Sequence, residues 1–546
     1  MTAAVSALAL TGLACASAAD AAGPGRPATR PATHPVTRWA HLADRVPTPH
    51  LRWQACQKTD QCATTELPLS YRRPRGAKIS VALLRVRAAD PGRALGTIFV
   101  NPGGPGDSAR AFAALLPQAL PKVILDRFDI VGVDPRGVGG STALRCFTSP
   151  AARDRTLAPF SATPFPSTPR RQRAVIRAAR GLGRACSTTG RKIASAMDTT
   201  DDALDMDVLR RAVGDRKLTY FGESYGSYLG EVYANMFPGR VRALVIDGIV
   251  DPQELVGTRA TAHVPVFDRV GSAAASGRAL SELLKLCRQA GRARCSFASP
   301  HPNARFARLA ARLRARPLRL AAPGVKATTF AYPDMIADTE HWLHDPSGYR
   351  GLIPELTDLA RLAAPGGGGS GHAALVRALL RLHAELAAPP GFDTLLQAQS
   401  AVLCTDPRSG ASAAAWPAAA AAADRRAPYF GAYYAWFTVP CARDIWTAQD
   451  RDVYRGPFDR RTAAPVLVIG DLWDPATSYD SAVKVARMMP GSRLISSDSW
   501  GHEAAGTSAC VDDAIWGYLL RPRAAAPKVL HCRGDVQPFA SPAAGR

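Results

Sequence analysis

A serine between two glycines constrains this chain more than any other stretch of its sequence. Residues 222–226 read Gly-Glu-Ser-Tyr-Gly. Residues 218–221 before them have the apolar character of a short buried strand, and residues 227–234 after them have the pattern of a helix. A tight turn between a strand and a helix leaves no room for side-chain carbons beside the serine, which explains a glycine at each end. We therefore expect Ser224 at the carboxyl end of a sheet, near the positive end of the following helix.

The rest of the chain alternates between buried strands and helices. Strand patterns occur at 79–87, 96–100, 128–133, 243–248, 465–470 and 492–496, and helix patterns at 108–120, 200–213 and 509–520. Such alternation is typical of a parallel sheet with helices on both faces. From 251 to 445 the strand signal is weak and helical stretches dominate. We predict an α/β fold with a mostly parallel central sheet flanked by helices, into which a mainly helical cap domain is inserted.

These patterns divide the chain into six predicted segments. They are a signal peptide (1–18), a disordered leader rich in Pro and Ala (19–47), the first part of the sheet domain (48–250), the helical cap (251–445), the second part of the sheet domain (446–535) and a flexible tail (536–546). The signal peptide is predicted from a short apolar run that precedes Ala16, Ser17 and Ala18, a small-residue cleavage pattern. We expect a secreted protein without stable membrane insertion; the alternative is a lipid anchor at the cell surface through Cys15.

The formal net charge of +23 raises the question of a polyanionic partner. The Lys and Arg residues are scattered among Ala and Pro, and the chain has neither zinc-finger spacing nor a basic helix interleaved with aromatic residues. We therefore expect no nucleic-acid binding.

The eleven cysteines are typical of an exported, disulfide-bonded protein. Removal of Cys15 with the leader leaves ten, an even number. Nearness in the sequence suggests five local pairs, namely Cys56–Cys62, Cys146–Cys186, Cys287–Cys295, Cys404–Cys441 and Cys510–Cys532. The chain has no Cys-x-x-Cys pair, so a metal is not expected. His341 and His344 have helical spacing but lack a third ligand, and we expect both at the surface.

A serine nucleophile needs a general base and an acid that orients the base. On a sheet of this kind the order along the chain is Ser, then Asp or Glu, then His. Asp471 and Asp474 follow the strand at 465–470, and His502 follows the last predicted strand. We predict Ser224 as nucleophile, His502 as base and Asp474 as orienting acid. Asp474 lies further out along its turn, whereas we expect Asp471 to bond the loop backbone.

The oxyanion of an acyl-transfer intermediate needs hydrogen-bond donors. One predicted donor is the N–H of Tyr225. The other comes from residues 101–106, Asn-Pro-Gly-Gly-Pro-Gly, where glycines allow close approach of the backbone and prolines stiffen the loop. We favour Gly104 over Gly103 for this role. The loop lacks the G-x-G-x-x-G spacing of a dinucleotide site, and the predicted chemistry needs neither a cofactor nor a metal.

At these residues the chain resembles the secreted tripeptidyl aminopeptidases of actinobacteria, which are relatives of proline iminopeptidase among the α/β-hydrolases. The matching pieces run in family order over about residues 50–535: 53–56, 67–71, 101–106, 134–141, 222–226, 247–252, 404–406, 470–477, 501–502 and the segment around Cys510 and Cys532. The resemblance implies an α/β-hydrolase fold and an exopeptidase that releases short peptides, such as tripeptides, from free amino termini. The chain departs from the family at 107–109, Asp-Ser-Ala where Gly-Ser-Gly is frequent, and at Glu223, where small residues are also common.

An exopeptidase of this kind needs an acid that pairs with the substrate ammonium and a cap that limits peptide length. The sequence leaves this acid open among Glu223, Asp406 and the carboxylates of the cap. Two other functions stay open as well. A carboxylesterase or lipase-like hydrolase would use the same triad, whereas a non-catalytic binding protein on this scaffold would usually lack one triad member. We expect peptide or protein N-termini as substrates and leave the oligomeric state open.

Overall fold

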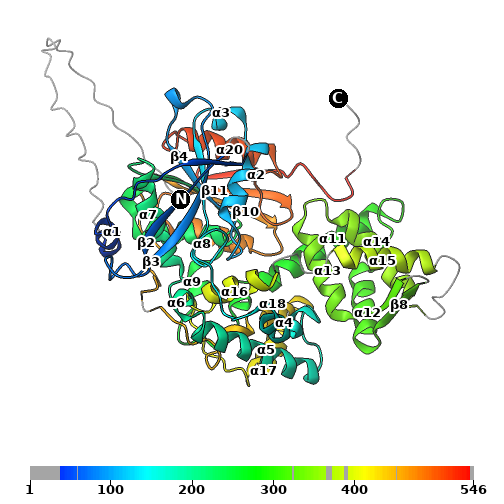
Figure 1. The fold of residues 1–546 in the computed structure, drawn as a ribbon. Coiled ribbons are helices and arrows are strands. Elements are labelled where there is room, and N and C mark those ends of the chain that lie inside the picture. The colour runs from blue at the N-terminus through cyan, green and yellow to red at the C-terminus, as the bar shows by residue number, and fades with distance from the viewer. Residues whose placement is uncertain are drawn as a thin grey trace, which may run out of the picture. The chain divides into compact units, whose positions relative to one another are not determined.

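A ten-stranded sheet forms the centre of the protein (Figure 1) within the residues that the computed structural model describes, which are 37–57, 60–322, 325–364, 372–385, 392–450 and 452–540. In spatial order its strands are β1 (Gln54–Gln57), β2 (Asp60–Pro68), β3 (Lys78–Val86), β5 (Asp129–Val133), β4 (Thr97–Asn101), β6 (Leu218–Glu223), β7 (Val241–Asp247), β10 (Val466–Trp473), β11 (Arg493–Trp500) and β12 (Val529–Cys532). The pairs β1–β2, β2–β3 and β3–β5 are antiparallel, and every pair from β5 onward is parallel. The predicted mostly parallel sheet is confirmed.

Side chains of the strands alternate between two cores, one on each face of the sheet. On β4, Phe99 packs in one core while Ile98 and Val100 pack in the other, as the period of two along a strand requires. The Phe99 face carries α1 (Arg38–Asp44), α7 (Thr199–Ala212), α8 (Tyr225–Met236) and α19 (Tyr479–Met488). The opposite face carries α2 (Ala109–Leu115), α3 (Lys122–Leu125) and α20 (Ala509–Leu520). The predicted helical layers on both faces are confirmed.

The insertion between β7 and β10 is mainly helical and has a hydrophobic core of its own. Its longer helices are α11 (Ser272–Ala290), α12 (Pro302–Ala315), α13 (Tyr332–His344), α14 (Tyr349–Leu362), α15 (His372–Glu385), α16 (Phe392–Leu403), α17 (Trp416–Arg426) and α18 (Phe430–Phe437), and its shorter ones are α9 (Pro252–Val256) and α10 (Val266–Arg269). An antiparallel hairpin of β8 (Leu318–Ala322) and β9 (Val325–Phe330) interrupts them. The sequence analysis did not predict this hairpin, because strands of five and six residues carry too short a pattern to stand out among helical stretches.

Two helices from outside the insertion pack against it. They are α4 (Pro150–Ser161) and α5 (Pro169–Thr188), which lie beside α17 and α18 in Figure 1. Leu157 of α4 and Leu182 of α5 share a core with Leu396 and Leu403 of α16. The predicted first part of the sheet domain (48–250) thus contains two helices that complete the cap. The sequence patterns had predicted no helix in the stretch that holds α4.

Both ends of the described chain are more ordered than predicted. Helix α1 falls within the predicted disordered leader (19–47), and its Trp39 is buried in a core of the sheet domain. Phe539 falls within the predicted flexible tail (536–546), is 9% exposed and has its ring centroid 5.1 Å from that of Tyr349. Composition misses such single aromatic anchors in segments of small or polar residues. The predicted signal peptide (1–18) and Cys15 lie outside the described residues.

All five predicted disulfides are present. They join Cys56 to Cys62, Cys146 to Cys186, Cys287 to Cys295, Cys404 to Cys441 and Cys510 to Cys532. The second ties the segment after β5 to α5, and the fourth ties the end of α16 to the segment after α18. The cap region is thus cross-linked where it returns toward the sheet.

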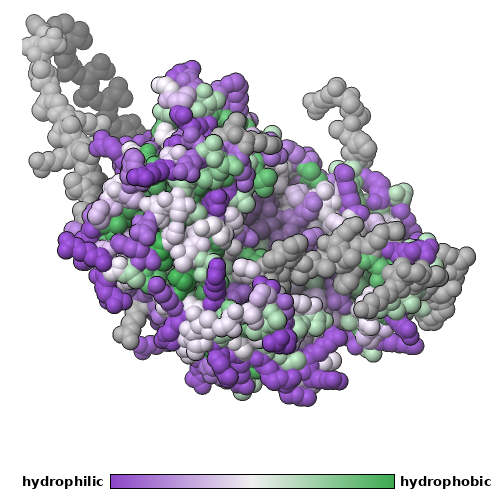
Figure 2. Space-filling view, in the orientation of Figure 1, coloured by the Kyte–Doolittle hydropathy of each residue, from purple (hydrophilic) through white to green (hydrophobic). Residues whose placement is uncertain are grey.

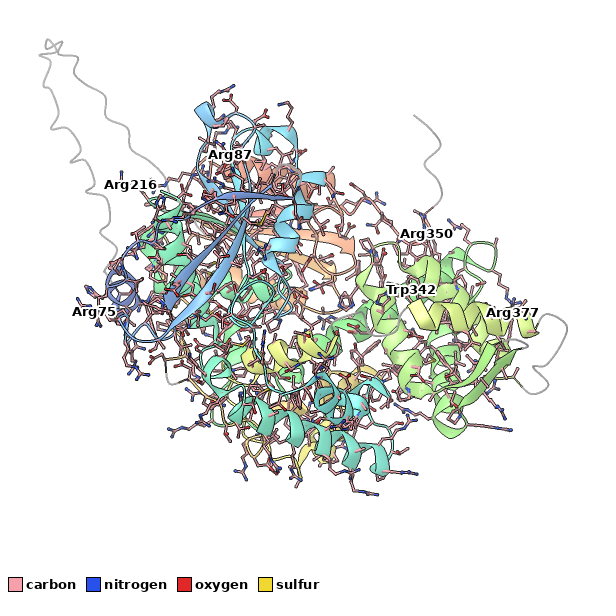
Figure 3. All side chains as sticks on the ribbon, in the orientation of Figure 1. Arg75, Arg87, Arg216, Trp342, Arg350 and Arg377 are labelled. Atoms are coloured by element: carbon pink, nitrogen blue, oxygen red, sulfur yellow. A yellow bond between two sulfur atoms is a disulfide. The ribbon has the colours of Figure 1, made fainter. Side chains whose placement is uncertain are left out.

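Cationic side chains are spread over the surface, as predicted from their scatter in the sequence. Arg75, Arg87, Arg216 and Arg350 are exposed and come from different elements (Figure 3). Hydrophilic residues cover much of the face seen in Figure 2. The described helices include none with the length and hydrophobicity that a bilayer-spanning segment needs.

Loss of the Cys404–Cys441 bridge should destabilise the protein more than loss of Cys56–Cys62. The two bridges span 37 and 6 residues, and the entropy of loop closure predicts losses of about 4 and about 2 kcal/mol. We expect this order in the unfolding free energies of the variants Cys404→Ala/Cys441→Ala and Cys56→Ala/Cys62→Ala, measured by urea titration. An equal or reversed order would contradict it.

Candidate active site

Ser224 occupies the predicted sharp turn between β6 and α8. Its backbone has φ 55° and ψ −124°, a left-handed conformation that costs a non-glycine residue free energy and that clusters at functional sites. The turn is crowded on both sides: a Cβ at Gly222 would clash with the Gly226 carbonyl, and one at Gly226 would lie 2.5 Å from the Asn101 carbonyl oxygen. The strand–turn–helix element predicted from the glycine spacing is confirmed.

His502 and Asp474 meet at the carboxyl ends of β11 and β10. The Nδ1 atom of His502 lies 3.0 Å from Oδ1 and 2.9 Å from Oδ2 of Asp474. Asp474 also accepts hydrogen bonds from the N–H groups of Ala476 and Thr477 and from the Thr477 hydroxyl. The imidazole is therefore held in one orientation, with Nε2 as the nitrogen available for proton transfer.

The two partners shift each other's pKa values. Burial works to raise the pKa of Asp474, but attraction to His502 and the hydrogen bonds from His502 and Thr477 outweigh it and lower the pKa. Burial works to lower the pKa of His502, but attraction to Asp474 and their hydrogen bond outweigh it and raise the pKa. These shifts favour a carboxylate that stabilises the imidazolium formed during catalysis.

Asp471, the alternative acid, has another environment on the same strand. Burial, followed by repulsion from Asp474 and Asp247, raises the pKa of Asp471 well above its usual range. Asp474, by contrast, holds the hydrogen bond to His502. The geometry supports the predicted choice of Asp474.

Ser224 and His502 face one cavity of about 330 Å³, which Gly104 and Tyr225 also line. A Cβ at Gly248 would lie 3.2 Å from both the Ser224 nitrogen and the Cε1 atom of His502. The predicted nucleophile and base therefore flank the same small residue. We propose Ser224, His502 and Asp474 as a catalytic triad on this arrangement.

Two backbone N–H groups beside Ser224 are suited to an oxyanion. Tyr225 is the first residue of α8, so its N–H has no acceptor within the helix. The Gly103 N–H donates to Asn101 Oδ1 at 2.9 Å, whereas no hydrogen bond among the described residues uses the Gly104 N–H. A Cβ at Gly103 would lie 2.8 Å from the Tyr225 nitrogen, so the loop lies directly against the turn. This supports Gly104 and Tyr225 as the proposed donors.

The prediction that His341 and His344 are surface residues is wrong for His344. His341 is exposed, but the carboxyl end of α13 brings His344 to the cavity. The carbonyl of His344 accepts the N–H of His502 at 2.9 Å, and the two rings stand edge to face with centroids 5.3 Å apart. Helical spacing in a sequence carries no information about which end of a cap helix reaches the sheet.

Acidic side chains line the cavity, and among the described residues that line it there is no Lys or Arg. The acids are Asp107, Glu340 and Glu503. Glu340 of α13 is only 6% exposed, and its carboxyl accepts hydrogen bonds from Tyr434 at 2.6 Å and Tyr433 at 3.4 Å. The sequence indicated cap carboxylates only as a group, because nothing in the pattern of α13 distinguishes Glu340.

The other two predicted candidates for the ammonium-binding acid lie elsewhere. Asp406 is 1% exposed and does not line the cavity; it accepts hydrogen bonds from the N–H and the hydroxyl of Thr199. Burial, followed by repulsion from Asp198, raises the pKa of Asp406 to about 8. Glu223 lies behind Ser224, where burial, followed by repulsion from Asp247, raises its pKa to about 8.

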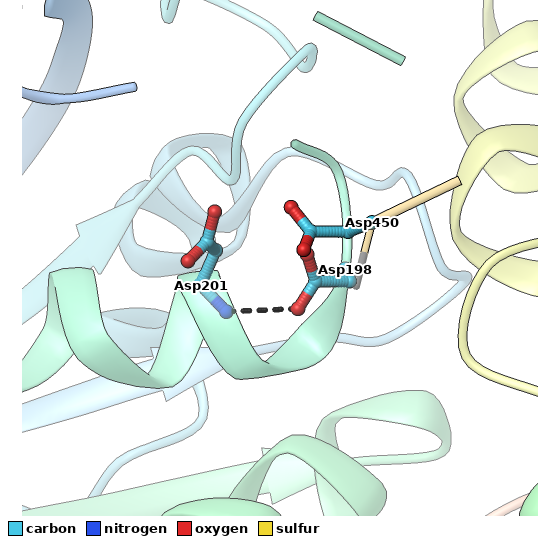
Figure 4. Close-up of side chains that lie close together, drawn as sticks. All are labelled: Asp198, Asp201 and Asp450. Atoms are coloured by element: carbon cyan, nitrogen blue, oxygen red, sulfur yellow. Dashed lines mark hydrogen bonds between the residues drawn. The ribbon is translucent and has the colours of Figure 1, made fainter. Parts of the chain in front are cut away.

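Three aspartates outside the cavity lie close enough together to raise the question of a metal ion (Figure 4). Asp198, Asp201 and Asp450 each offer a carboxylate oxygen, and these oxygens lie within 4.8 Å of one another. Asp198 caps α7 by accepting the N–H of Thr200 at 3.0 Å, and Asp201 pairs with Arg136 at 2.5 Å. Because these contacts explain two of the three carboxylates, we assign the cluster to the fold.

Comparison with known proteins adds two matching families and several relatives. Residues 96–317 match the family model described as alpha/beta hydrolase fold, and residues 427–531 match the one described as TAP-like protein. The chain is 28% identical over 499 residues to a tripeptidyl aminopeptidase from Streptomyces lividans, covering 89% of this chain and 87% of that relative. It is 30% identical over 494 residues to carboxylesterase B from Mycobacterium tuberculosis, covering 87% and 88%. The serine protease Hip1 of the same organism is 37% identical over 213 residues, which are 37% of this chain and 40% of that protein.

Replacement of Asp474 should show which of Asp471 and Asp474 orients His502. We expect Asp474→Asn to lower kcat by about 10⁴-fold, because the amide favours the wrong histidine tautomer. The measurement is hydrolysis of a simple aryl ester, and Asp471→Asn is the matched control that should keep most activity. If Asp471→Asn lost more activity than Asp474→Asn, the acid that orients His502 would be Asp471.

Activity should disappear as the pH falls, because only neutral His502 can accept the proton of Ser224. The pKa of His502 is raised in the folded protein, so the half-point of kcat/KM should lie above about pH 6.5, the ordinary value for His. A pH profile of aryl-ester hydrolysis measures it. A half-point clearly below pH 6 would argue against His502 as the base.

Proposed function

Because the chain belongs to the α/β-hydrolases with a TAP-like carboxyl-terminal segment, we propose that it is a secreted serine exopeptidase that releases short peptides, chiefly tripeptides, from free amino termini. Ser224 attacks the scissile carbonyl while His502 takes its proton, and Asp474 stabilises the imidazolium. The N–H groups of Gly104 and Tyr225 stabilise the oxyanion. His502 then protonates the leaving amine, and water hydrolyses the acyl-enzyme with His502 again as base.

The relatives by themselves do not separate amide from ester chemistry, since a tripeptidyl aminopeptidase and a carboxylesterase match over similar lengths. Both reactions would use the same triad. The choice between them therefore depends on what else the cavity contains.

Glu340 is the observation that carries the exopeptidase proposal. Its carboxyl is nearly buried in the cavity that Ser224 also lines, and the described lining of that cavity supplies no Lys or Arg to pair with it. A buried carboxylate without a cation is unfavourable, and the ammonium group of a peptide would supply that cation. The rings of Tyr433 and Tyr434 beside it would add cation–π attraction. A neutral ester without an amine would leave the Glu340 carboxyl with only its contacts to Tyr433, Tyr434 and His344.

The position of Glu340 also fits a short peptide. Its Oε1 atom lies 3.2 Å from His344 Nδ1, and the His344 ring centroid lies 5.3 Å from that of His502. These contacts put the carboxyl within about 10 Å of the His502 ring, a reach of about three extended residues. A substrate with its ammonium at Glu340 would present its second or third peptide bond to Ser224.

Secretion is supported by the disulfides. Five bridges are typical of a protein that works in an oxidising compartment. We propose export through the predicted signal peptide (1–18), with a lipid anchor at Cys15 as the alternative, and peptide or protein N-termini as the partners.

The decisive test pairs substrates with and without a free amine. A tripeptide anilide with a free amino terminus should be cleaved far better than its acetylated form. We expect Glu340→Gln to lower kcat/KM for the free-amine substrate by about ten- to hundredfold, the cost of a lost hydrogen bond to a charged group. Cleavage of the acetylated substrate should stay at its native level.

Glu282→Gln is the matched control, because it makes the same change on α11 outside the cavity lining. If Glu340→Gln lowered kcat/KM equally for the free-amine and the acetylated anilide, Glu340 would not be the residue that binds the substrate ammonium. If the native protein hydrolysed an aryl ester and neither anilide, the carboxylesterase function would replace the exopeptidase one.

A further inference from the structure

Glu503 places a carboxyl group at the reacting nitrogen of His502. Its Oε1 atom lies 3.4 Å from His502 Nε2, on the side of the imidazole opposite Asp474. The backbone of Glu503 has φ 75°, which is uncommon for a residue with a side chain. Its N–H donates to Asp474 Oδ2 at 3.3 Å. The strained backbone is thus held by the triad acid, and the side chain lines the cavity.

A second carboxyl supports Glu503 from the end of β6. The carboxyls of Glu223 and Glu503, the residues next to Ser224 and His502, act on each other's pKa. Burial, followed by repulsion from Glu223, raises the pKa of Glu503 well above its usual range. Two buried carboxyls that repel each other favour a shared proton over two negative charges.

Glu503 lies beside the nitrogen of His502 that protonates the leaving group in the proposed reaction. In acyl transfer, Nε2 delivers its proton to the leaving atom, which must come within about 2.6–3.2 Å of it. A carboxyl oxygen 3.4 Å from Nε2 is therefore a neighbour of that leaving atom. An amide nitrogen leaves as an amine with N–H groups to donate, whereas the leaving oxygen of an ester starts with none.

We propose that Glu503, supported by Glu223, is a further catalytic residue that accepts a hydrogen bond from the leaving amine and so favours amide over ester substrates. In this step the C–N bond breaks, its electron pair stays on nitrogen, and nitrogen receives the proton of His502 Nε2. The departing amine then donates an N–H hydrogen bond to the carboxyl of Glu503. Glu503 neither gains nor loses a proton in this step. The inference rests on the proposed roles of Ser224 and His502.

Other charged groups face His502 without this contact. Asp474 is on Nδ1, Asp247 comes from the end of β7, and Glu340 and His344 come from α13. Asp107 acts on Glu503 itself. Since removal of any acid here also shifts the pKa of His502, the test must compare two substrates at one pH on the plateau of the profile.

The test uses a tetrapeptide with a free amino terminus and its depsipeptide, in which oxygen replaces the scissile N–H group. Both give the same acyl-enzyme, so kcat/KM reports the steps up to departure of the leaving group. We expect Glu503→Ala to lower kcat/KM for the tetrapeptide by about ten- to hundredfold and to leave the depsipeptide near its native value. Glu503→Gln retains a carbonyl acceptor and should recover part of the tetrapeptide activity.

Glu340→Gln is the control. Both substrates carry the same amine, so this variant should lower kcat/KM for the tetrapeptide and the depsipeptide alike. Equal losses on both substrates in Glu503→Ala would overturn the inference, since Glu503 would then act through His502 or the fold. No loss on either would overturn it as well. A native protein that cleaved neither substrate would refute the proposed function, and the inference with it.

Discussion

The carboxyl end of β7 connects the two reacting side chains. The carbonyl of Asp247 accepts the N–H of Ser224 at 2.9 Å, and its buried carboxyl accepts the N–H groups of Ala504 and Ala505 just after His502. Burial raises the pKa of Asp247 to about 6, although these hydrogen bonds oppose the shift. The backbone and the side chain of one residue thus hold the turn at Ser224 and the loop after His502 to the end of the same strand.

Two parts of the chain, the sheet domain and the cap, contribute different residues to the candidate site. The sheet domain supplies the proposed triad on strand ends, where the positions are fixed by ladder hydrogen bonds. The cap supplies α13, whose terminal carbonyl holds the backbone of His502 and whose Glu340 faces the cavity. The sheet domain thus positions the proposed reacting residues, whereas the cap positions the carboxyl that we propose to bind the substrate ammonium.

The sequence indicated the residues of the proposed triad more directly than the cap residues at the cavity, for a physical reason. The glycines around Ser224, the strand ends before Asp474 and His502, and the Gly-rich loop at Gly104 are local patterns that a single stretch can show. Glu340 and His344 reach the cavity only because α13 packs on α14 and α18, and such contacts leave no periodic trace. Helix α4 was missed because its Pro residues resemble those of a loop; one stands at its start, where proline is tolerated.

The packing of α4 and α5 has a consequence for how substrates enter. In the described chain the cap region is joined to the sheet not only at the two ends of the insertion but also before α4 and after α5, and a disulfide binds α5 to the segment after β5. We expect a cap with this many connections to the sheet domain to keep a fixed position and not to open as a hinged lid. Such a cap around a cavity of about 330 Å³ would admit an extended end of the proposed peptide substrates and exclude a folded protein terminus.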